Sequence, residues 1–155
     1  MRKTTSKTEV SLDELMPLIR ERIAQGQSVR FYPNGVSMLP MLRPRVDSVV
    51  LSAPPPKLKK HDLALYQRED GAFVLHRIIE VGETYCCVGD NQFRQETGLK
   101  HEQIIALVTA FYRGDKLHSV HEPGYRLYCR FWRFYRKVRI LRLRLIRRLR
   151  IKDKT

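Results

Sequence analysis

Residues 63–88, LALYQREDGAFVLHRIIEVGETYCCV, contain three largely apolar segments joined by two short polar ones. Glu69-Asp70-Gly71 is a strong hairpin turn, and Gly82-Glu83 offers a second turn. The apolar segments have the length of strands and carry Val, Ile, Tyr and Phe, which favour β-structure. This stretch therefore predicts an antiparallel meander with strands at 63–67, 73–81 and 84–88.

The sequence on either side of the meander extends the β-structure. Further strand-like segments lie at 28–32, 48–51 and 104–112. Before them, residues 11–14 have the pattern of a helix capping box, and apolar residues follow at helical spacing as far as Gly26. We expect a mainly β fold, a coiled antiparallel sheet or partial barrel, with a short N-terminal helix and a basic amphipathic C-terminal helix.

Length and charge indicate one domain with a basic tail. The chain has 155 residues and a formal net charge of +14. Residues 126–152 carry twelve of the 30 basic side chains and no acidic one, so the rest is nearly neutral. We expect a disordered N-terminus at 1–10, a folded domain at 11–120 and the tail at 121–155. No signal peptide is visible and no apolar run approaches the ~18 residues that span a bilayer, which predicts a cytoplasmic protein.

The tail has the pattern of an amphipathic helix, because residues 126–152 are all basic or apolar. Its apolar stripe consists of Leu127, Phe131, Phe134 or Tyr135, Val138, Leu141, Leu145 and Leu149. Arginines beside such a stripe suit the headgroup region of an anionic bilayer, so we predict peripheral attachment to the inner face of the membrane. One alternative is a helix that docks its stripe on the domain. Another is a nucleic-acid partner, which we do not favour.

Three separate segments contain a candidate catalytic set. Ser37 lies in the Gly/Pro-bounded turn Gly35–Pro40, which would hold a nucleophilic hydroxyl in a fixed, exposed position. His76 interrupts an apolar strand, and an imidazole is a suitable general base at neutral pH. The alternative interpretations are a serine that only forms a β-turn and a histidine that only packs.

An acidic side chain would orient the imidazole, and two are available. Asp90 lies in the turn Gly89-Asp90-Asn91, and Glu96 follows six residues later. The sequence does not decide between them. Arg77 should point to the opposite face of its strand from His76, where we expect it to pair with a carboxylate in a structural role.

The three cysteines do not form a metal-binding pattern. Cys86 and Cys87 are neighbours on one predicted strand and should face opposite sides, and Cys129 lies in the tail. There is no CxxC motif or Cys/His cluster of the kind that binds zinc. We expect buried or idle thiols and no metal or other cofactor.

Taken together, the ordered motifs resemble the signal peptidase/LexA superfamily of serine peptidases. The resemblance covers residues 28–112, more than half of the chain. The motifs that carry it are Gly-x-Ser-Met-x-Pro-x-Leu at 35–42, Asp-x-Val-Val at 47–50, the strand entry Lys59–Tyr66, His76-Arg77-Ile78 and Gly89-Asp90-Asn91.

The resemblance implies coiled antiparallel strands with the serine at the edge of a substrate groove. His76 stands where many members have a lysine, as in the branch that uses Ser, His and an acid. By motif, Ser37 is the nucleophile and His76 the base. Asp90 matches the Gly-Asp-Asn aspartate, whereas the branch's triad acid falls where this chain has Glu96, so either remains a candidate.

Two departures from the superfamily bear on function. The membrane-spanning helix that normally precedes the serine is replaced by a polar helix, and no helix-turn-helix precedes the core. We therefore expect a serine endopeptidase that binds extended leader-like or signal-like peptides at or near a membrane surface. The alternatives are a noncatalytic, membrane-associated peptide-binding module and, less favoured, a nucleic-acid-binding protein.

Overall fold

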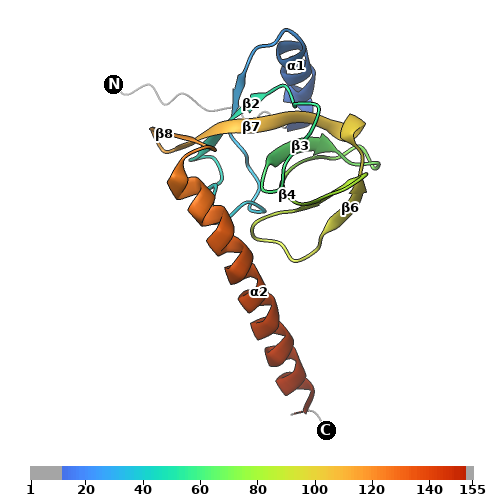
Figure 1. Cartoon of the computed structure of the whole chain (residues 1–155), viewed down its shortest axis with the longest axis vertical. Helices are drawn as coiled ribbons and strands as arrows, with labels where there is room; N and C mark the ends of the chain where they lie inside the picture. Colours follow the sequence, from blue (N-terminus) through green and yellow to red (C-terminus); the bar gives the residue numbers. More distant parts are fainter. Residues whose placement is uncertain (1–11, 153–155) are drawn as a thin grey trace, which may run out of the picture.

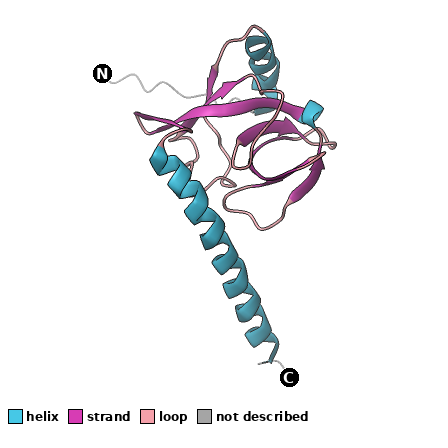
Figure 2. Ribbon diagram, in the orientation of Figure 1, coloured by secondary structure: helices cyan, strands magenta, loops and turns pink. Residues whose placement is uncertain are grey.

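The computed structural model describes residues 12–152, with side chains described for all of them except Arg133, Ile140 and 143–152. Two predictions, the disordered segment 1–10 and the capping residue Ser11, lie outside the described residues. The sheet curls around the core, α1 lies at one end of it, and α2 extends away from the body (Figure 1, Figure 2). The elements are α1 Leu12–Ala24, β1 Val29–Phe31, β2 Ser48–Ser52, β3 Leu63–Gln67, β4 Phe73–Val81, β5 Tyr85–Val88, β6 Glu96–Leu99, the 3-10 turn His101–Gln103, β7 Ile104–Arg113, β8 Lys116–Ser119 and α2 Pro123–Lys152.

The eight strands form one open antiparallel sheet. Seven follow the order β1-β2-β7-β3-β4-β5-β6, and β8 pairs with β7. The strands β3, β4 and β5 are the predicted meander, and β3 and β4 pair with Ala64 opposite His76. The mainly β fold and both helices were predicted from the sequence, whereas the sheet does not close into a barrel.

Strands β6 and β8 were not predicted. β6 has the sequence ETGL, and its Gly98 has a positive φ of 78°. β8 is a four-residue edge strand without a buried side chain. Neither segment has the apolar alternation from which strands are recognised, so pairing with β5 and β7 decides their conformation.

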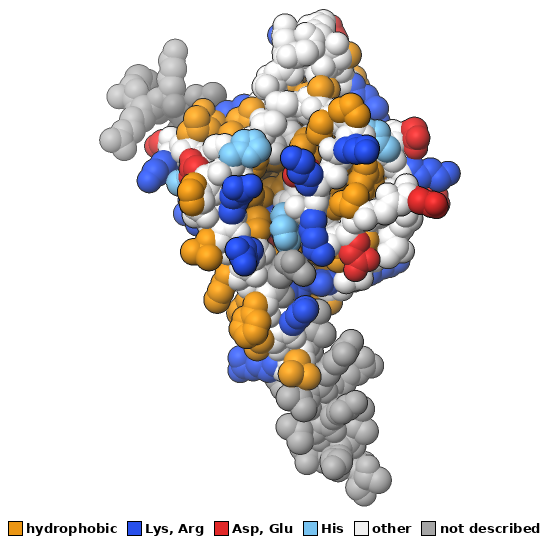
Figure 3. Space-filling view, in the orientation of Figure 1, with side chains coloured by type: hydrophobic (Ala, Val, Ile, Leu, Met, Phe, Trp, Pro, Cys, Tyr) orange, Lys and Arg blue, Asp and Glu red, His pale blue; other side chains and the backbone are white. Residues whose placement is uncertain are grey.

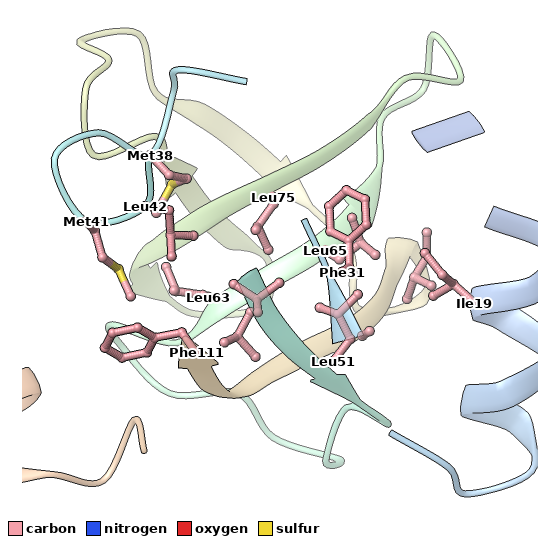
Figure 4. Close-up of a cluster of buried hydrophobic side chains, with 14 of the residues drawn as sticks. Ile19, Phe31, Met38, Met41, Leu42, Leu51, Leu63, Leu65, Leu75 and Phe111 are labelled. Carbon is pink, nitrogen blue, oxygen red and sulfur yellow. The ribbon is translucent and has the colours of Figure 1, made fainter. Parts of the chain in front are cut away.

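The main hydrophobic core fills the space between α1 and one face of the sheet. Figure 4 shows Ile19 of α1 close to Phe31, Leu51 and Leu65. The turn after Ser37 contributes Met38, Met41 and Leu42, which are all buried in this core. The turn that carries the candidate nucleophile is therefore anchored by its own apolar side chains.

The opposite face of β3 and β4 covers a second, smaller core. It contains Ala64, Tyr66, Ile78, Cys87 and Leu99. Cys86 points away from this cluster into a third one with Trp132, which confirms the opposite orientation predicted for the two adjacent cysteines. All three cysteines are free and buried.

Helix α2 begins as part of the folded body. Tyr125 and Cys129 belong to the main core, and Trp132 packs against Ile79 and Val88. The apolar stripe predicted from the sequence does not make this contact, because its described members lie exposed. Across the described residues, no helix has both the length and the apolar character needed to cross a membrane.

Candidate active site

The Ser37 turn is fixed by backbone hydrogen bonds. The amide of Leu42 donates to the carbonyl of Met38 at 3.0 Å, and that of Leu39 to the carbonyl of Val36 at 3.2 Å. Ser37 itself is half-buried, less exposed than its position in a Gly/Pro turn suggested. These bonds restrain the backbone of the turn that carries the Ser37 hydroxyl, and a nucleophile needs such a fixed support.

Gly89 lets the serine turn approach the histidine. A Cβ at this position would lie 2.7 Å from the carbonyl oxygen of Ser37 and 3.1 Å from Nε2 of His76. The Ser37 carbonyl oxygen and His76 Nε2 therefore both border the space that a side chain at position 89 would fill, so only glycine fits there. The amide of Asn91 also donates to the Ser37 carbonyl at 2.8 Å, which ties the Ser37 turn to the loop after β5.

His76 has its other ring nitrogen in contact with an acid. Nδ1 lies 3.2 Å from Oε1 of Glu96 and 3.2 Å from the hydroxyl of Tyr66. Arg68 holds the carboxylate of Glu96 with two hydrogen bonds, one of them 2.7 Å from Nε to Oε2. Glu96, His76 and the Ser37 turn thus follow one another in space. Among the residues that the structure describes, no hydrogen bond joins Ser37 Oγ to His76.

Burial and charge set the protonation of this group. Burial lowers the pKa of His76 to about 4, although the charge of Glu96 acts in the other direction. Burial also acts to raise the pKa of Glu96, but hydrogen bonds from Arg68 and Tyr66 outweigh it and the net shift is downward. At neutral pH the carboxylate only accepts, so the imidazole proton lies on Nδ1 and the lone pair on Nε2. A neutral imidazole with Nε2 free is the form that acts as a general base.

Asp90, the other candidate acid, is bound elsewhere. Its carboxylate forms a bidentate pair with Arg77, with both contacts at 2.7 Å and both side chains fully buried. The hydroxyl of Tyr128 also donates to it at 3.0 Å. The structural pairing expected for Arg77 is confirmed, and Glu96 is the candidate acid that contacts the imidazole.

Tyr66 and Arg68 also belong to the site, although no sequence motif indicated them. Tyr66 lies two residues from Ala64, the register partner of His76, and so shares the face of His76. Its phenol is fully buried, and burial raises its pKa well above the usual value, which keeps it neutral. The hairpin predicted from the sequence joins the strands of Tyr66 and His76, so it contained a signal for Tyr66. Arg68 follows the end of β3, where register no longer fixes direction.

An open cavity of about 970 Å³ lies beside this group. The segment Asn91–Leu99 forms most of its wall, and Arg68, Glu69, Asp70 and Gln103 also line it. Glu96 therefore faces both His76 and the cavity. Ser37 and His76 do not line it, so the cavity adjoins the candidate catalytic residues on the side of the acid.

The comparisons with known proteins return no relative. No protein-family model matches the chain, and neither a curated protein nor a solved structure matches it significantly. In the part of the chain that the structure describes, no group of three or more His, Cys, Asp or Glu side chains is arranged to hold a metal ion.

The pKa of His76 predicts that the protein loses stability as the pH falls below neutral. In the unfolded chain this imidazole binds a proton near pH 6.5, and in the folded protein only near pH 4. Between these values the unfolded state binds more protons, so the free energy of unfolding rises with pH across this window. Urea unfolding at a series of pH values should show this slope, and His76→Asn should flatten it. The exposed His121→Asn is the matched control, and an unchanged slope in His76→Asn would contradict the prediction.

Proposed function

We propose that this protein is a serine endopeptidase with Ser37 as nucleophile, His76 as general base and Glu96 as the acid that orients it. The observation that carries the proposal is the position of His76, with Glu96 on Nδ1 and Nε2 directed at the space beside the Ser37 turn. This is the order of groups that covalent serine catalysis needs. The fold is proposed to be of the signal peptidase/LexA type.

The proposed reaction begins with attack of Ser37 Oγ on the scissile carbonyl carbon. His76 Nε2 accepts the hydroxyl proton, and Glu96 stabilises the imidazolium that forms. Collapse of the tetrahedral intermediate breaks the peptide bond, and His76 returns the proton to the leaving amine. A water molecule, activated by the same base, then hydrolyses the acyl-enzyme. Backbone N–H groups near Ser37 would bind the oxyanion.

A hydrogen bond between Ser37 Oγ and Nε2 is expected to form when substrate is bound. Catalytic hydrogen bonds are often long or absent in unliganded proteins and tighten in the complex. By resemblance, the substrates are leader-like or signal-like segments with small side chains near the cut, bound as an extended strand.

Labelling with a fluorophosphonate probe tests the proposal directly. We expect the probe to modify Ser37 of the folded protein, as located by mass spectrometry of the labelled peptide. Glu96→Gln should slow labelling by about 10²- to 10⁴-fold, because the imidazole loses the carboxylate that sets its tautomer. Glu80→Gln, at an exposed position on the same strand as His76, should label at the wild-type rate.

Two results would contradict the proposed peptidase. One is a folded protein whose Ser37 stays unlabelled while a peptide still binds, which would indicate the noncatalytic binding module. The other is equal labelling of wild type and Glu96→Gln, which would remove the acid from the proposed catalytic group.

A further inference from the structure

Helix α2 has two opposite faces with different surroundings. Tyr125, Cys129 and Trp132 are buried against the body. At 3.6 residues per turn, the stripe from Leu127 to Leu141 lies roughly 180° around the helix from these three. One helix thus has a docked face and, on its far side, an apolar face without a partner among the described residues.

The unpartnered face is large and continuous. Its side chains are Leu127, Phe131, Phe134, Tyr135, Val138 and Leu141, exposed by 68, 63, 65, 50, 46 and 59%. The stripe is about 21 Å long at 1.5 Å per residue. Apolar residues scattered singly over a surface need no explanation, but a continuous row of this kind marks a contact site. Figure 3 shows apolar and basic side chains next to each other along the described part of the helix.

Cations flank this face. Arg126, Arg130 and Lys137 are exposed along one side of the stripe and Arg142 on the other. The helix contains no acidic residue from Pro123 to Lys152. A second copy of the same helix would bring two polycations together, and like charges at close range are unfavourable. The partner that suits the face is therefore anionic and apolar at once.

We propose that this face of α2 lies in the headgroup region of an anionic lipid bilayer. The apolar row would enter the boundary between headgroups and acyl chains, and the flanking cations would meet the lipid phosphates. Nucleic acid fits less well, because phosphate contacts would use the arginines and leave Phe131, Phe134 and Leu141 in water.

The docked face would fix how the body sits on the bilayer. Trp132 Nε1 donates to the carbonyl of Asp90 at 3.1 Å, and Arg139 donates to Asn91 Oδ1 at 3.0 Å. The two acceptors, Asp90 and Asn91, belong to the loop after β5. The backbone amide of Asn91 also donates to the Ser37 carbonyl. A lipid-bound α2 would therefore keep the Ser37 turn at a constant height beside the membrane surface.

Vesicle sedimentation with the full chain tests this proposal. We expect binding to phosphatidylcholine vesicles that contain about one third phosphatidylglycerol, and little binding to phosphatidylcholine alone. The triple variant Phe131→Ser, Phe134→Ser, Leu141→Ser should bind at least about 100-fold more weakly, because these side chains supply the buried apolar area. A matched control is Val46→Ser, Val81→Ser, Leu117→Ser, which removes three apolar side chains of similar exposure elsewhere.

Three results would overturn the proposal. They are equal vesicle binding by wild type and the helix triple variant, a preference for duplex DNA over the anionic vesicles, and a dimer in solution that the helix triple variant dissociates. Since all the substituted residues are exposed, both variants should fold, and thermal unfolding checks this. Ser37→Ala should bind vesicles like wild type, so failure of the membrane proposal is distinguishable from failure of the peptidase proposal.

Discussion

Replacing Ser37 with alanine is expected to lower kcat/KM for peptide hydrolysis by about 10³- to 10⁶-fold. The substitution removes the oxygen that would form the acyl-enzyme, and His76 has no other nucleophile to activate in the same position. Stability should change by less than about 0.5 kcal/mol, because the hydroxyl is half-buried and makes no hydrogen bond with His76. Cleavage of candidate leader peptides, followed by mass spectrometry of the products, measures the effect.

Ser28→Ala is the matched control for this experiment. Ser28 is exposed on the surface, where its hydroxyl lies 2.9 Å from that of Ser52. The control should hydrolyse peptides at the wild-type rate. If Ser37→Ala also retained the wild-type rate while folded, then Ser37 would not be the nucleophile and the activity would have another origin.

The strand pattern of the sequence carried most of the information on the fold. The turns around Asp70 and Gly82 gave the meander, and alternation along β4 placed His76 and Arg77 on opposite faces. Both side chains are buried, yet each finds a carboxylate, Glu96 for His76 and Asp90 for Arg77. The alternation of side chains along β4 predicted that His76 and Arg77 would lie on opposite faces. It did not predict which carboxylate each side chain would contact.

The choice between Asp90 and Glu96 depends on contacts that a sequence pattern does not contain. Gly89 ends the regular geometry of β5, so the directions of the following side chains depend on tertiary packing. Asp90 turns toward Arg77 because Tyr128 and Trp132 of α2 hold it there. Glu96 returns to His76 because β6 pairs with β5, with Glu96 opposite Cys87.

Helix α2 shows a similar limit of periodicity. The row that begins at Leu127 and the row that begins at Tyr125 are both apolar at helical spacing, so either row fits a core-facing stripe. The structure docks the row that contains Tyr125, Cys129 and Trp132. Its aromatic rings surround the guanidinium of Arg77, with Trp132 at 5.3 Å from ring centroid to Cζ. The buried charge of Arg77 thus selects the face that a hydrophobic pattern alone leaves open.

Removal of the Asp90 carboxylate is expected to destabilise the protein by about 3–5 kcal/mol. In Asp90→Ala, Arg77 would remain fully buried with its positive charge unpaired. Its remaining partners are all neutral: the hydroxyl of Tyr125 at 2.9 Å, the sulfurs of Cys129 at 3.0 Å and Met41 at 3.1 Å, and the carbonyl of His61 at 3.2 Å. The midpoint of thermal unfolding should fall by about 10 °C or more. Glu122→Gln, at the partly exposed pair with His118, should lower this midpoint far less than Asp90→Ala does, because solvent screens that pair.

The double variant Arg77→Met, Asp90→Leu separates a structural role of Asp90 from a catalytic one. Replacing both members of a buried ion pair with apolar side chains of similar volume is often close to neutral, so most of the lost stability should return. If Glu96 alone orients His76, the folded double variant should hydrolyse peptides with kcat/KM within about tenfold of wild type. A double variant that unfolds at the wild-type temperature but has lost its activity would assign the carboxylate of Asp90 to the chemistry. Glu96→Gln should lose activity but keep its unfolding temperature. Removing the charge of Glu96 changes the tautomer of His76 and leaves the Arg77–Asp90 pair intact.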